Sequence, residues 1–448
     1  MSAHRRQIYF RPNVAQYSQP QHSNAALKFH ETLPDYNPTP LIPLDDLARE
    51  LGITGVYVKH EGDRLGLPSF KILGASWGTF RAIVDKTNLT IDASLPELSN
   101  AAKEQSIALF AATDGNHGRA VAFMAKLLQI RAKIYVPASV DEATQALISG
   151  EGAEVVATSG SYDDAVQVAS RTADSIPGGL LIQDTAFDGY EEIPSWIIEG
   201  YTAMLHEIDS QFGERNLRPT MVVTPVGVGS LAQAVVSHYK APEHRIDVMT
   251  VEPDTAACLH KSLRTGKCAP LSTTRTIMNG LDCGTVSSTA WPILREGVDI
   301  SATISDFEAH DAVQYLKSQG IGAGPCGAAS VAALRLLCSA RPLDSNTVVV
   351  LLCTEGLRPY PTPFDVSTED PGGISRILQQ IYLSNKSSPD TTAPGYTSVA
   401  NYIAAWLEHR ALEKHEIGAV LGSNLGNFDL AGVAQSMVSL LCPKKGVV

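Results

Sequence analysis

Short apolar runs alternate along the chain with stretches whose apolar residues recur at helical spacing. The runs are rich in β-branched residues and are bounded by polar turns, which is the pattern of buried strands. Seven of them are predicted strands: residues 107–111, 133–136, 154–157, 180–182, 221–224, 248–251 and 348–352. Segments such as 72–80 and 119–128 have helical spacing. This alternation predicts an α/β fold of open, doubly wound twisted sheets flanked by helices.

The size and charge of the chain limit its partners. It has 448 residues, 44% of them hydrophobic, and a formal net charge of −12. This length predicts two lobes with a substantial core. The acidic balance, without a long Lys/Arg cluster, argues against nucleic acid. No signal-peptide core follows Arg5 and Arg6, and no run is long enough for a membrane span, so we expect a cytoplasmic protein.

Cysteine and acidic residues give no sign of a metal. The seven cysteines are scattered, and none forms a Cys-x-x-Cys pair, so neither a disulfide framework nor a zinc site is indicated. The acidic pairs at 163–164 and 191–192 lack a third ligand at suitable spacing and are expected on exposed helix faces. We therefore expect no metal.

Lys71 is the first candidate for chemistry. It ends a Pro-Ser-Phe-Lys segment and directly precedes the predicted helix 72–80. Phe70 and Ile72 flank it, which predicts partial burial, and burial lowers the pKa of a lysine and makes it nucleophilic. Such an amine can form a Schiff base with an aldehyde cofactor and then act as a base. Taken alone, a lysine here is more often a solvated surface charge.

A second loop, residues 112–118, reads Ala-Thr-Asp-Gly-Asn-His-Gly and joins the predicted strand 107–111 to the predicted helix 119–128. Its glycines let backbone amides approach a ligand, and Asn116 can both donate and accept a hydrogen bond. The alternative is an ordinary Asp-Gly turn with a helix cap. We expect His117 to pack at the helix entrance rather than to act as a base.

A third loop, residues 225–231, reads Pro-Val-Gly-Val-Gly-Ser-Leu and can hold a phosphate against the amides of a helix end. It also fits a dinucleotide fingerprint, because Ala232 takes the last small position and Glu252 follows the next strand. A dehydrogenase is thus a rival interpretation of this loop, although it explains neither Lys71 nor Asn116. Taken together, the three loops favour pyridoxal 5′-phosphate.

These motifs resemble the diaminopropionate ammonia-lyases, a family in the tryptophan synthase β group (fold type II) of pyridoxal-phosphate enzymes. The resemblance includes Ser-Phe-Lys at 69–71, Gly-Asn-His-Gly at 115–118, the glycine loop and Cys-Thr-Glu-Gly at 353–356. Longer similar stretches start at Phe29, Lys59, Gln183 and Ile277, and the last two read Gln-Asp-Thr-Ala-Phe-Asp-Gly-Tyr-Glu-Glu-Ile-Pro and Ile-Met-Asn-Gly-Leu-Asp-Cys-Gly. The patches span roughly residues 26–360.

The resemblance implies a role for each cofactor position. Lys71 matches the cofactor lysine, with Phe70 before it, and Asn116 the residue beside the pyridine 3-hydroxyl. The phosphate cradle comprises Gly227, Val228, Gly229, Ser230 and Leu231. Cys353 or Thr354 falls where a neutral group contacts the pyridine nitrogen, which suits β-elimination better than transamination. On composition alone, Cys353 is equally well a small buried apolar residue.

Two aspartates carry the implied substrate. Related dehydratases typically have a small apolar residue at the position of Asp114, whereas the ammonia-lyases have an aspartate there and at Asp184. The resemblance implies 2,3-diaminopropionate, converted through an aminoacrylate to pyruvate and ammonia. Asp114 would serve as the base opposite Lys71, so that both enantiomers are accepted, and Asp184 would attract and protonate the leaving β-amine. The alternative for Asp184 is a helix-capping turn.

Fold type II also implies a layout and leaves two other functions open. The expected larger, cofactor-binding lobe is 1–87 plus 219–382, and the smaller lobe is 88–218. Residues 383–448 read as a linker and a helical extension that departs from the family. That departure keeps open β-elimination or β-replacement on another amino acid, such as serine. A non-catalytic binding protein is the third possibility. The expected partners are a small amino acid and a second copy in a homodimer.

Overall fold

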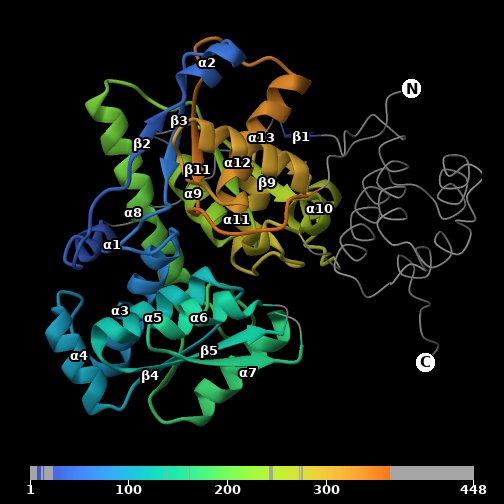
Figure 1. Cartoon of the computed structure of the whole chain (residues 1–448). Helices are drawn as coiled ribbons and strands as arrows, with labels where there is room; N and C mark the ends of the chain where they lie inside the picture. The colour runs from blue at the N-terminus through green and yellow to red at the C-terminus, as the bar shows by residue number, and fades with distance from the viewer. Residues whose placement is uncertain are drawn as a thin grey trace, which may run out of the picture.

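The computed structural model describes residues 8–11, 14, 24–138, 140–160, 162–241, 246–271, 273 and 276–363. Within them the chain forms a seven-stranded and a four-stranded sheet, each flanked by helices (Figure 1). The predicted linker and helical extension, 383–448, lie outside the described residues. No helix in the described ranges is both long and apolar enough to cross a membrane.

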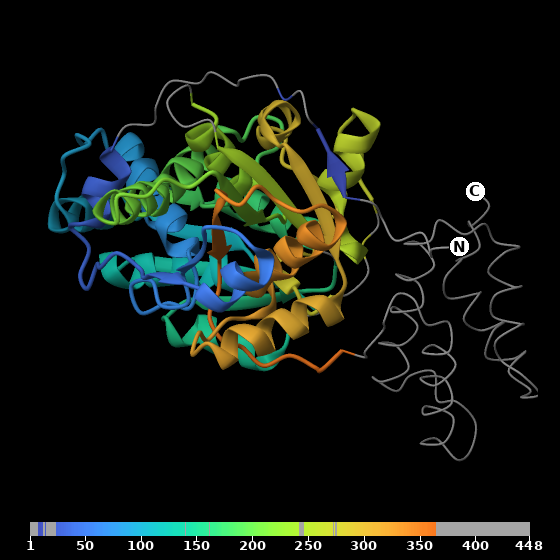
Figure 2. The same cartoon turned by 90° about the horizontal axis from the view of Figure 1, so that it is seen from above.

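The larger sheet has the strand order β1-β10-β9-β8-β11-β3-β2. Its five central strands run parallel, and the two edge strands, β1 and β2, pair antiparallel to their neighbours. Figure 2 shows β1, from the N-terminal part of the chain, along one edge. The strands are β1 (Tyr9–Phe10), β2 (Leu41–Pro43), β3 (Gly55–His60), β8 (Met221–Pro225), β9 (Asp247–Pro253), β10 (Ile300–Ile304) and β11 (Val348–Cys353).

The smaller sheet is entirely parallel and has the order β6-β5-β4-β7. Its strands are β4 (Ala108–Ala112), β5 (Arg131–Pro137), β6 (Glu154–Thr158) and β7 (Gly179–Leu181). All four fall inside the predicted smaller lobe, whose exact limits stay a prediction. The α/β fold class is confirmed.

Helices cover both faces of each sheet, which is why the central strands are apolar throughout rather than alternating. All six residues of β11 are buried, and alternate side chains enter opposite cores. The helices are α1 (Ala25–His30), α2 (Asp45–Leu51), α3 (Lys71–Thr87), α4 (Leu95–Glu104), α5 (Asn116–Leu128), α6 (Glu142–Gly150), α7 (Tyr162–Ser175), α8 (Glu192–Glu214), α9 (Ser230–Tyr239), α10 (Cys258–Thr265), α11 (Ala290–Gly297), α12 (Asp306–Ser318) and α13 (Pro325–Ala340).

All seven predicted strands are present, and each bound lies within two residues of its predicted position. Four further strands, β1, β2, β3 and β10, were missed. β3 was missed because its buried set includes Lys59, and a buried lysine breaks the apolar pattern of a core strand.

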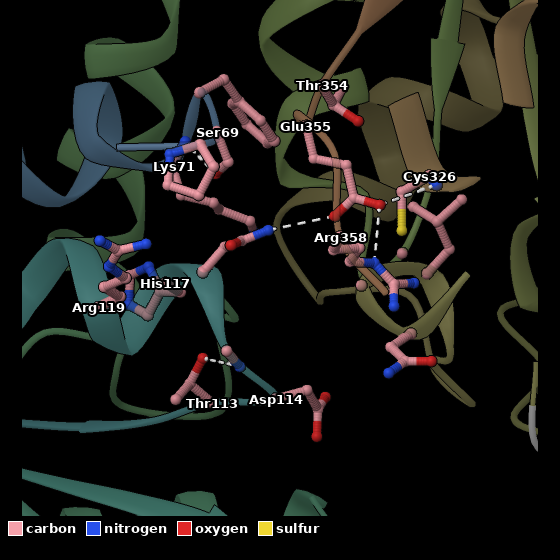
Figure 3. A pocket seen from close by; sticks show the side chains of 18 of the residues that line it. Ser69, Lys71, Thr113, Asp114, His117, Arg119, Cys326, Thr354, Glu355 and Arg358 are labelled. Carbon is pink, nitrogen blue, oxygen red and sulfur yellow. Dashed lines mark hydrogen bonds and ion pairs between the residues drawn. The ribbon is translucent and has the colours of Figure 1, made fainter. Parts of the chain in front are cut away.

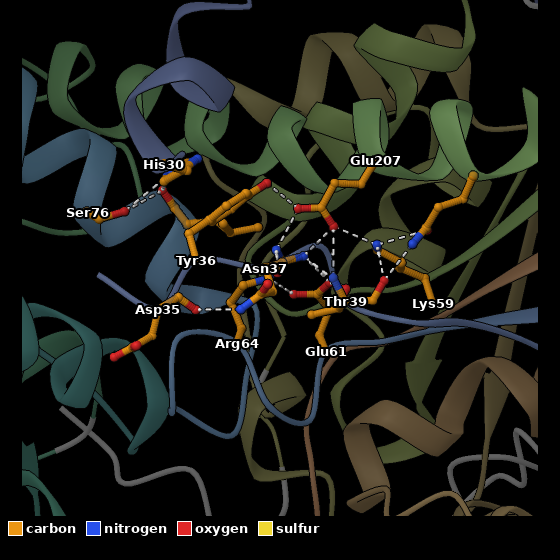
Figure 4. A network of polar contacts seen from close by, with 12 residues as sticks. His30, Asp35, Tyr36, Asn37, Thr39, Lys59, Glu61, Arg64, Ser76 and Glu207 are labelled. Atoms are coloured by element: carbon orange, nitrogen blue, oxygen red, sulfur yellow. Dashed lines mark hydrogen bonds and ion pairs between the residues drawn. The ribbon is translucent and has the colours of Figure 1, made fainter. Parts of the chain in front are cut away.

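Lys59 is buried within a charged network that connects β3 to α8 (Figure 4). Its ammonium lies 2.6 Å from Glu207, whose other oxygen lies 2.6 Å from Arg64. Arg64 also pairs with Glu61 at 2.6 Å, so two cations face two carboxylates. The charges balance, which is the condition for burying them without an unpaired ion. The network fixes the start of the segment that leads from β3 to Lys71.

Candidate active site

A cavity of about 730 Å³ lies at the carboxyl ends of parallel strands from both sheets. Its walls include the segments that follow β3, β4, β8 and β11, together with Asp184 beyond β7. Figure 3 shows Lys71, Asp114 and Thr354 from three of these segments. Ligands of open α/β sheets bind at this edge. The cavity therefore brings together side chains that lie far apart in the chain, such as Asp63 and Pro359.

Lys71 is the first residue of α3 and lies on the cavity wall with its side chain 23% exposed, so the predicted partial burial is confirmed. Its ammonium pairs with the carboxylate of Asp184. Burial alone would lower the pKa of Lys71, but the adjacent Asp184 raises it above the ordinary value. The expectation of a lowered lysine pKa is thus wrong for this structure, because the sequence did not reveal the paired carboxylate.

Asp184 is buried in the turn after β7, well before α8 begins, so it is not a helix cap. Burial opposes its ionisation, yet Lys71 and, secondarily, His117 lower its pKa to about 2. The Nδ1 atom of His117 lies 3.9 Å from Asp184, and its Nε2 contacts the carbonyl of Ile182 at 2.8 Å. His117 thus lies at the helix entrance, as predicted, and acts on Asp184 only through its charge.

Asp114 lines the same cavity but has the opposite electrostatic environment. Burial and the nearby carboxylates of Asp282 and Asp184 raise its pKa to about 7, against a smaller opposing effect of Lys71. The pKa values of the two aspartates in this cavity are therefore shifted in opposite directions. Such a separation is what acid–base chemistry near neutral pH requires.

Asn116 is the first residue of α5, and its side chain contacts a residue that follows β11 of the larger sheet. Its amide donates to Glu355 at 3.2 Å. The other oxygen of Glu355 accepts the backbone amide of Cys326 at 3.0 Å and Arg358 at 3.1 Å. Glu355 therefore connects the first turn of α5, beside the smaller sheet, to the end of β11 in the larger one.

The glycine loop, residues 227–231, joins β8 to α9 and lines the cavity throughout. Gly229 has a φ of +100°, a conformation that other residues rarely adopt. A Cβ atom on Gly227 would lie 2.8 Å from the carbonyl of Gly280. No side chain caps the start of α9, so its first amides face the cavity as an anion site.

Glu252 rules out the dinucleotide interpretation of this loop. Its two carboxylate oxygens accept the backbone amides of Leu259 and His260, each at 2.7 Å, at the start of α10. The side chain is fully buried. It is thus occupied as a helix cap and is not available to a ribose.

The two candidates for the pyridine nitrogen lie differently. Thr354 lines the cavity, whereas Cys353 lies behind the wall, fully buried, with its sulfur 3.7 Å from the carbonyl of Glu355. A Cβ atom on Gly327 would lie 3.0 Å from that sulfur. Cys353 therefore packs as the small buried residue that composition alone suggested, and it is the one predicted site residue that the structure does not place on the cavity.

Sequence reasoning missed several residues of the cavity wall, among them Tyr162, Cys283, Glu355 and Arg358. Glu355 belongs to a motif that was recognised without a role. The turn at 322–327, a Gly-Ala-Gly-Pro-Cys-Gly segment that leads into α13, contributes Cys326 to the wall. No local pattern marks Tyr162 or Arg358, because both reach the site only through tertiary packing.

The comparison with protein families identifies the class of enzyme. The model of the pyridoxal-phosphate dependent enzyme family matches residues 32–354. The chain belongs to this family of enzymes. The match spans most of the described residues and includes the cavity-lining segments up to Thr354.

Individual relatives identify a smaller group of enzymes within this family. The chain is 34% identical to the diaminopropionate ammonia-lyase of Salmonella typhimurium over 357 residues, covering 74% of this chain and 88% of the relative. The Escherichia coli enzyme of the same name is also 34% identical, over 76% of this chain and 89% of the relative. The resemblance to diaminopropionate ammonia-lyases in the sequence motifs is confirmed.

The comparison with solved structures identifies the same group of enzymes. The chain superposes on the Escherichia coli diaminopropionate ammonia-lyase in complex with an aminoacrylate–PLP azomethine intermediate with a TM-score of 0.70 and 31% identity, covering 78% of this chain and 93% of that one. The same enzyme in complex with D-serine gives a TM-score of 0.71 and 32% identity, with the same coverage of both chains. The chain is thus a pyridoxal-phosphate-dependent carbon–nitrogen lyase of fold type II.

The residues present fit the cofactor. Gly227 leaves space where a Cβ would collide, and the uncapped start of α9 offers amides to a phosphate. Lys71 lies within the same cavity to hold an aldehyde, and Asn116 and Thr354 offer polar groups to a ring. This donor set matches the chemistry of pyridoxal phosphate.

Proposed function

We propose that the enzyme catalyses α,β-elimination of ammonia from 2,3-diaminopropionate, giving pyruvate and two molecules of ammonia. The observation that carries the proposal is the contact between the Lys71 ammonium and Asp184. A buried carboxylate in the cavity is already bound to an ammonium group, which is the group that distinguishes this substrate from serine. The naming of the relatives supports the same substrate.

Pyridoxal phosphate supplies the electron sink that makes the Cα proton of the bound amino acid acidic. Lys71 receives that proton on its Nζ atom from one side of the substrate. Asn116, held by Glu355, and the amides of residues 227–231 orient the cofactor, while Thr354 offers a neutral partner to its ring. These assignments follow the implied family roles and the position of each side chain on the cavity wall.

Asp184 acts on the leaving group. Elimination breaks the Cβ–N bond, and the electron pair departs with the nitrogen. A neutral amine would have to leave as an amide anion, whereas an ammonium leaves as ammonia. Asp184 binds the Lys71 ammonium in this structure. When Lys71 holds the cofactor or acts as the base, the β-nitrogen of the substrate would take that place beside the carboxylate and be held in the ammonium form. Water then hydrolyses the remaining imine to pyruvate, which releases the second ammonia.

Asp114 serves the second enantiomer. Figure 3 shows that Asp114 and Lys71 reach the cavity from different elements. A carboxyl group whose pKa is about 7 is ionised in a large fraction of molecules at neutral pH and binds a proton more tightly than an ordinary carboxylate. It is therefore suited to accept a Cα proton from the face that Lys71 does not reach.

Product analysis tests the proposal directly. Cofactor-loaded protein is incubated separately with L- and D-2,3-diaminopropionate and with serine, and pyruvate and ammonia are quantified. We expect one pyruvate and two ammonia per diaminopropionate consumed. Pyruvate from serine alone would reject the substrate but keep the elimination chemistry. No product from any of the three would direct the search to other β-substituted amino acids.

Assembly and location complete the proposal. We propose a homodimer, the commonest arrangement of soluble oligomers, working in the cytoplasm. The support for a reducing compartment is the odd number and scattered placement of the seven cysteines. Light scattering of the purified protein tests the dimer.

A further inference from the structure

A cluster of two histidines and an aspartate lies between α8 and α9, outside the cavity. His206 and Asp209 are one turn apart on α8 and therefore share a face of that helix. His238 lies in the last turn of α9. One ligand atom from each of the three residues lies within 4.8 Å of the others. The expectation of no metal rested on the cysteines and on the acidic pairs at 163–164 and 191–192. No local motif marks the present cluster, because His238 lies 29 positions beyond Asp209.

The chemistry of this set is that of a transition-metal site. Two imidazoles and one carboxylate, with the remaining positions open to water, are a frequent ligand set for Zn²⁺ and similar ions. With bonds of about 2.1 Å, tetrahedral ligand atoms lie roughly 3.4 Å apart, so small side-chain rotations bring the cluster to this geometry. The Asp209 side chain is 29% exposed, which leaves a path for the ion.

A simple ion pair explains only part of the cluster. His238 Nε2 lies 2.6 Å from Asp209 Oδ2 and forms a hydrogen bond with that carboxylate. That pair does not account for the second imidazole, His206, whose ring meets the ring of His238 edge-on at 5.1 Å. The ring of Tyr239 meets the ring of His238 edge-on at 4.7 Å and packs beside the cluster.

We propose that His206, Asp209 and His238 bind one divalent transition-metal ion, for which Zn²⁺ is the reference, and that the ion clamps the carboxyl end of α9 to α8. The start of α9 carries Ser230 of the glycine loop, and α8 carries Glu207 of the buried charged network. The clamp is structural. It takes no part in the elimination, and its ligands lie outside the residues that line the cavity.

Zinc titration of the holoenzyme tests the clamp. Full-length, cofactor-loaded protein is stripped with a chelator and titrated with Zn²⁺ by calorimetry, and Tm is measured with and without the ion. The variants are His206→Gln, which retains the His238–Asp209 pair, and Asp209→Asn. The control is His310→Gln on α12, where the imidazole contacts Tyr360 instead. Circular dichroism and cofactor absorption verify that each variant is folded.

We expect one equivalent of Zn²⁺ to bind to the wild type and to His310→Gln and to raise Tm in both, because a ligand that binds only the folded state stabilises it. Both cluster variants should lose that equivalent and the rise in Tm. Equal binding by all four proteins, or no saturable binding by the wild type, would overturn the proposal.

A second measurement uses the wild type alone. Diethyl pyrocarbonate modifies accessible imidazoles, and mass spectrometry locates the modified residues. Zn²⁺ should protect His206, the half-buried imidazole of the cluster, and should leave the modification of His310 unchanged. Equal modification of His206 with and without Zn²⁺ would contradict the site even where a variant does not fold. Neither readout depends on activity, so the clamp and the proposed substrate can fail independently.

Discussion

Asp114 and Asp184 illustrate how one residue type acquires two properties in the same cavity. Asp184 has a cationic partner, Lys71, and its pKa lies near 2. Asp114 is half-buried near the carboxylates of Asp282 and Asp184, and its pKa is raised to about 7. Desolvation raises the pKa of both carboxyl groups, so the difference comes from the charges that surround each of them.

Replacing Asp114 by Asn should affect the two enantiomers unequally. Only one face of the substrate loses its base, so we expect kcat/KM for one enantiomer of 2,3-diaminopropionate to fall by about 10²–10⁴-fold. The other should change by less than about tenfold. Steady-state kinetics with each enantiomer measures both values, and equal losses would contradict a two-base arrangement.

The pH dependence of the wild type provides a separate test of Asp114. A carboxyl group accepts a proton only when ionised, and the pKa of Asp114 is raised to about 7. For the enantiomer that depends on Asp114, kcat/KM should therefore rise with pH through about 7 and level off above it. For the other enantiomer, kcat/KM should not show this rise. The test range runs from about pH 6 to 8, on the order of one unit to either side of that pKa. If kcat/KM for both enantiomers is constant over this range, Asp114 is not the base.

Replacing Asp184 by Asn should have an effect that depends on the leaving group. The β-nitrogen must leave as ammonia and needs the carboxylate, whereas the chloride of β-chloroalanine leaves without a proton. We expect kcat for diaminopropionate to fall by about 10²–10⁴-fold and kcat for β-chloroalanine to fall far less. Comparable losses for both substrates would mean that Asp184 positions Lys71 rather than acting on the leaving group.

At the scale of the element, strand ends and helix starts create the site. Lys71 begins α3, Asn116 begins α5, and the glycine loop leads into α9. Each helix follows a parallel strand, so their starts gather at one edge of the sheets. The side chains on this edge are therefore positioned by backbone geometry, and glycine is required where the backbone itself must approach the ligand.

Gly229→Ala tests the glycine loop. The residue has a φ of +100°, and a Cβ atom would lie 3.0 Å from Leu294. We expect backbone strain of roughly 1–3 kcal/mol, or about a 5- to 150-fold weaker Kd for pyridoxal phosphate, measured by titrating the cofactor-free enzyme. The control is Gly213→Ala on α8, which has open space around a Cβ atom. An unchanged Kd in Gly229→Ala would show that the loop adjusts without cost.

At the scale of the whole molecule, buried charges connect the two sides of the site. Glu207 on α8 holds Lys59 of β3 and Arg64 of the segment that leads to Lys71. Glu355 joins Asn116 to the end of β11. These contacts cross between elements far apart in sequence, so the cavity depends on the assembly of the complete fold.

Glu207→Gln should destabilise the protein strongly. It leaves two buried cations with a weakened partner, and we expect a loss of about 3–5 kcal/mol in the free energy of unfolding, measured with urea. The matched control is Glu50→Gln, which removes an exposed pair with Arg335 and should cost less than about 1 kcal/mol. Similar losses in the two variants would contradict this account.

The loss of folding stability at acidic pH also depends on Glu207. The folded pKa of Glu207 is lowered to about 2 from an ordinary value of 4.5, despite burial, by Arg64 and Lys59. A lowered carboxyl pKa contributes stability above pH 4.5, and that stability is lost as pH falls toward 2. Glu207→Gln should flatten this part of the stability curve.

The sequence by itself determined the α/β class, seven of the strands, and the three loops that meet at the cavity, because strand, turn and helix patterns are local. It also identified Lys71, Asn116 and the two aspartates through motifs. Only the tertiary structure decided that Asp184 pairs with Lys71, that Thr354 rather than Cys353 faces the cavity, and that Glu252 caps a helix. Pairing, burial and pKa depend on neighbours distant in the chain, and no local pattern records those distances.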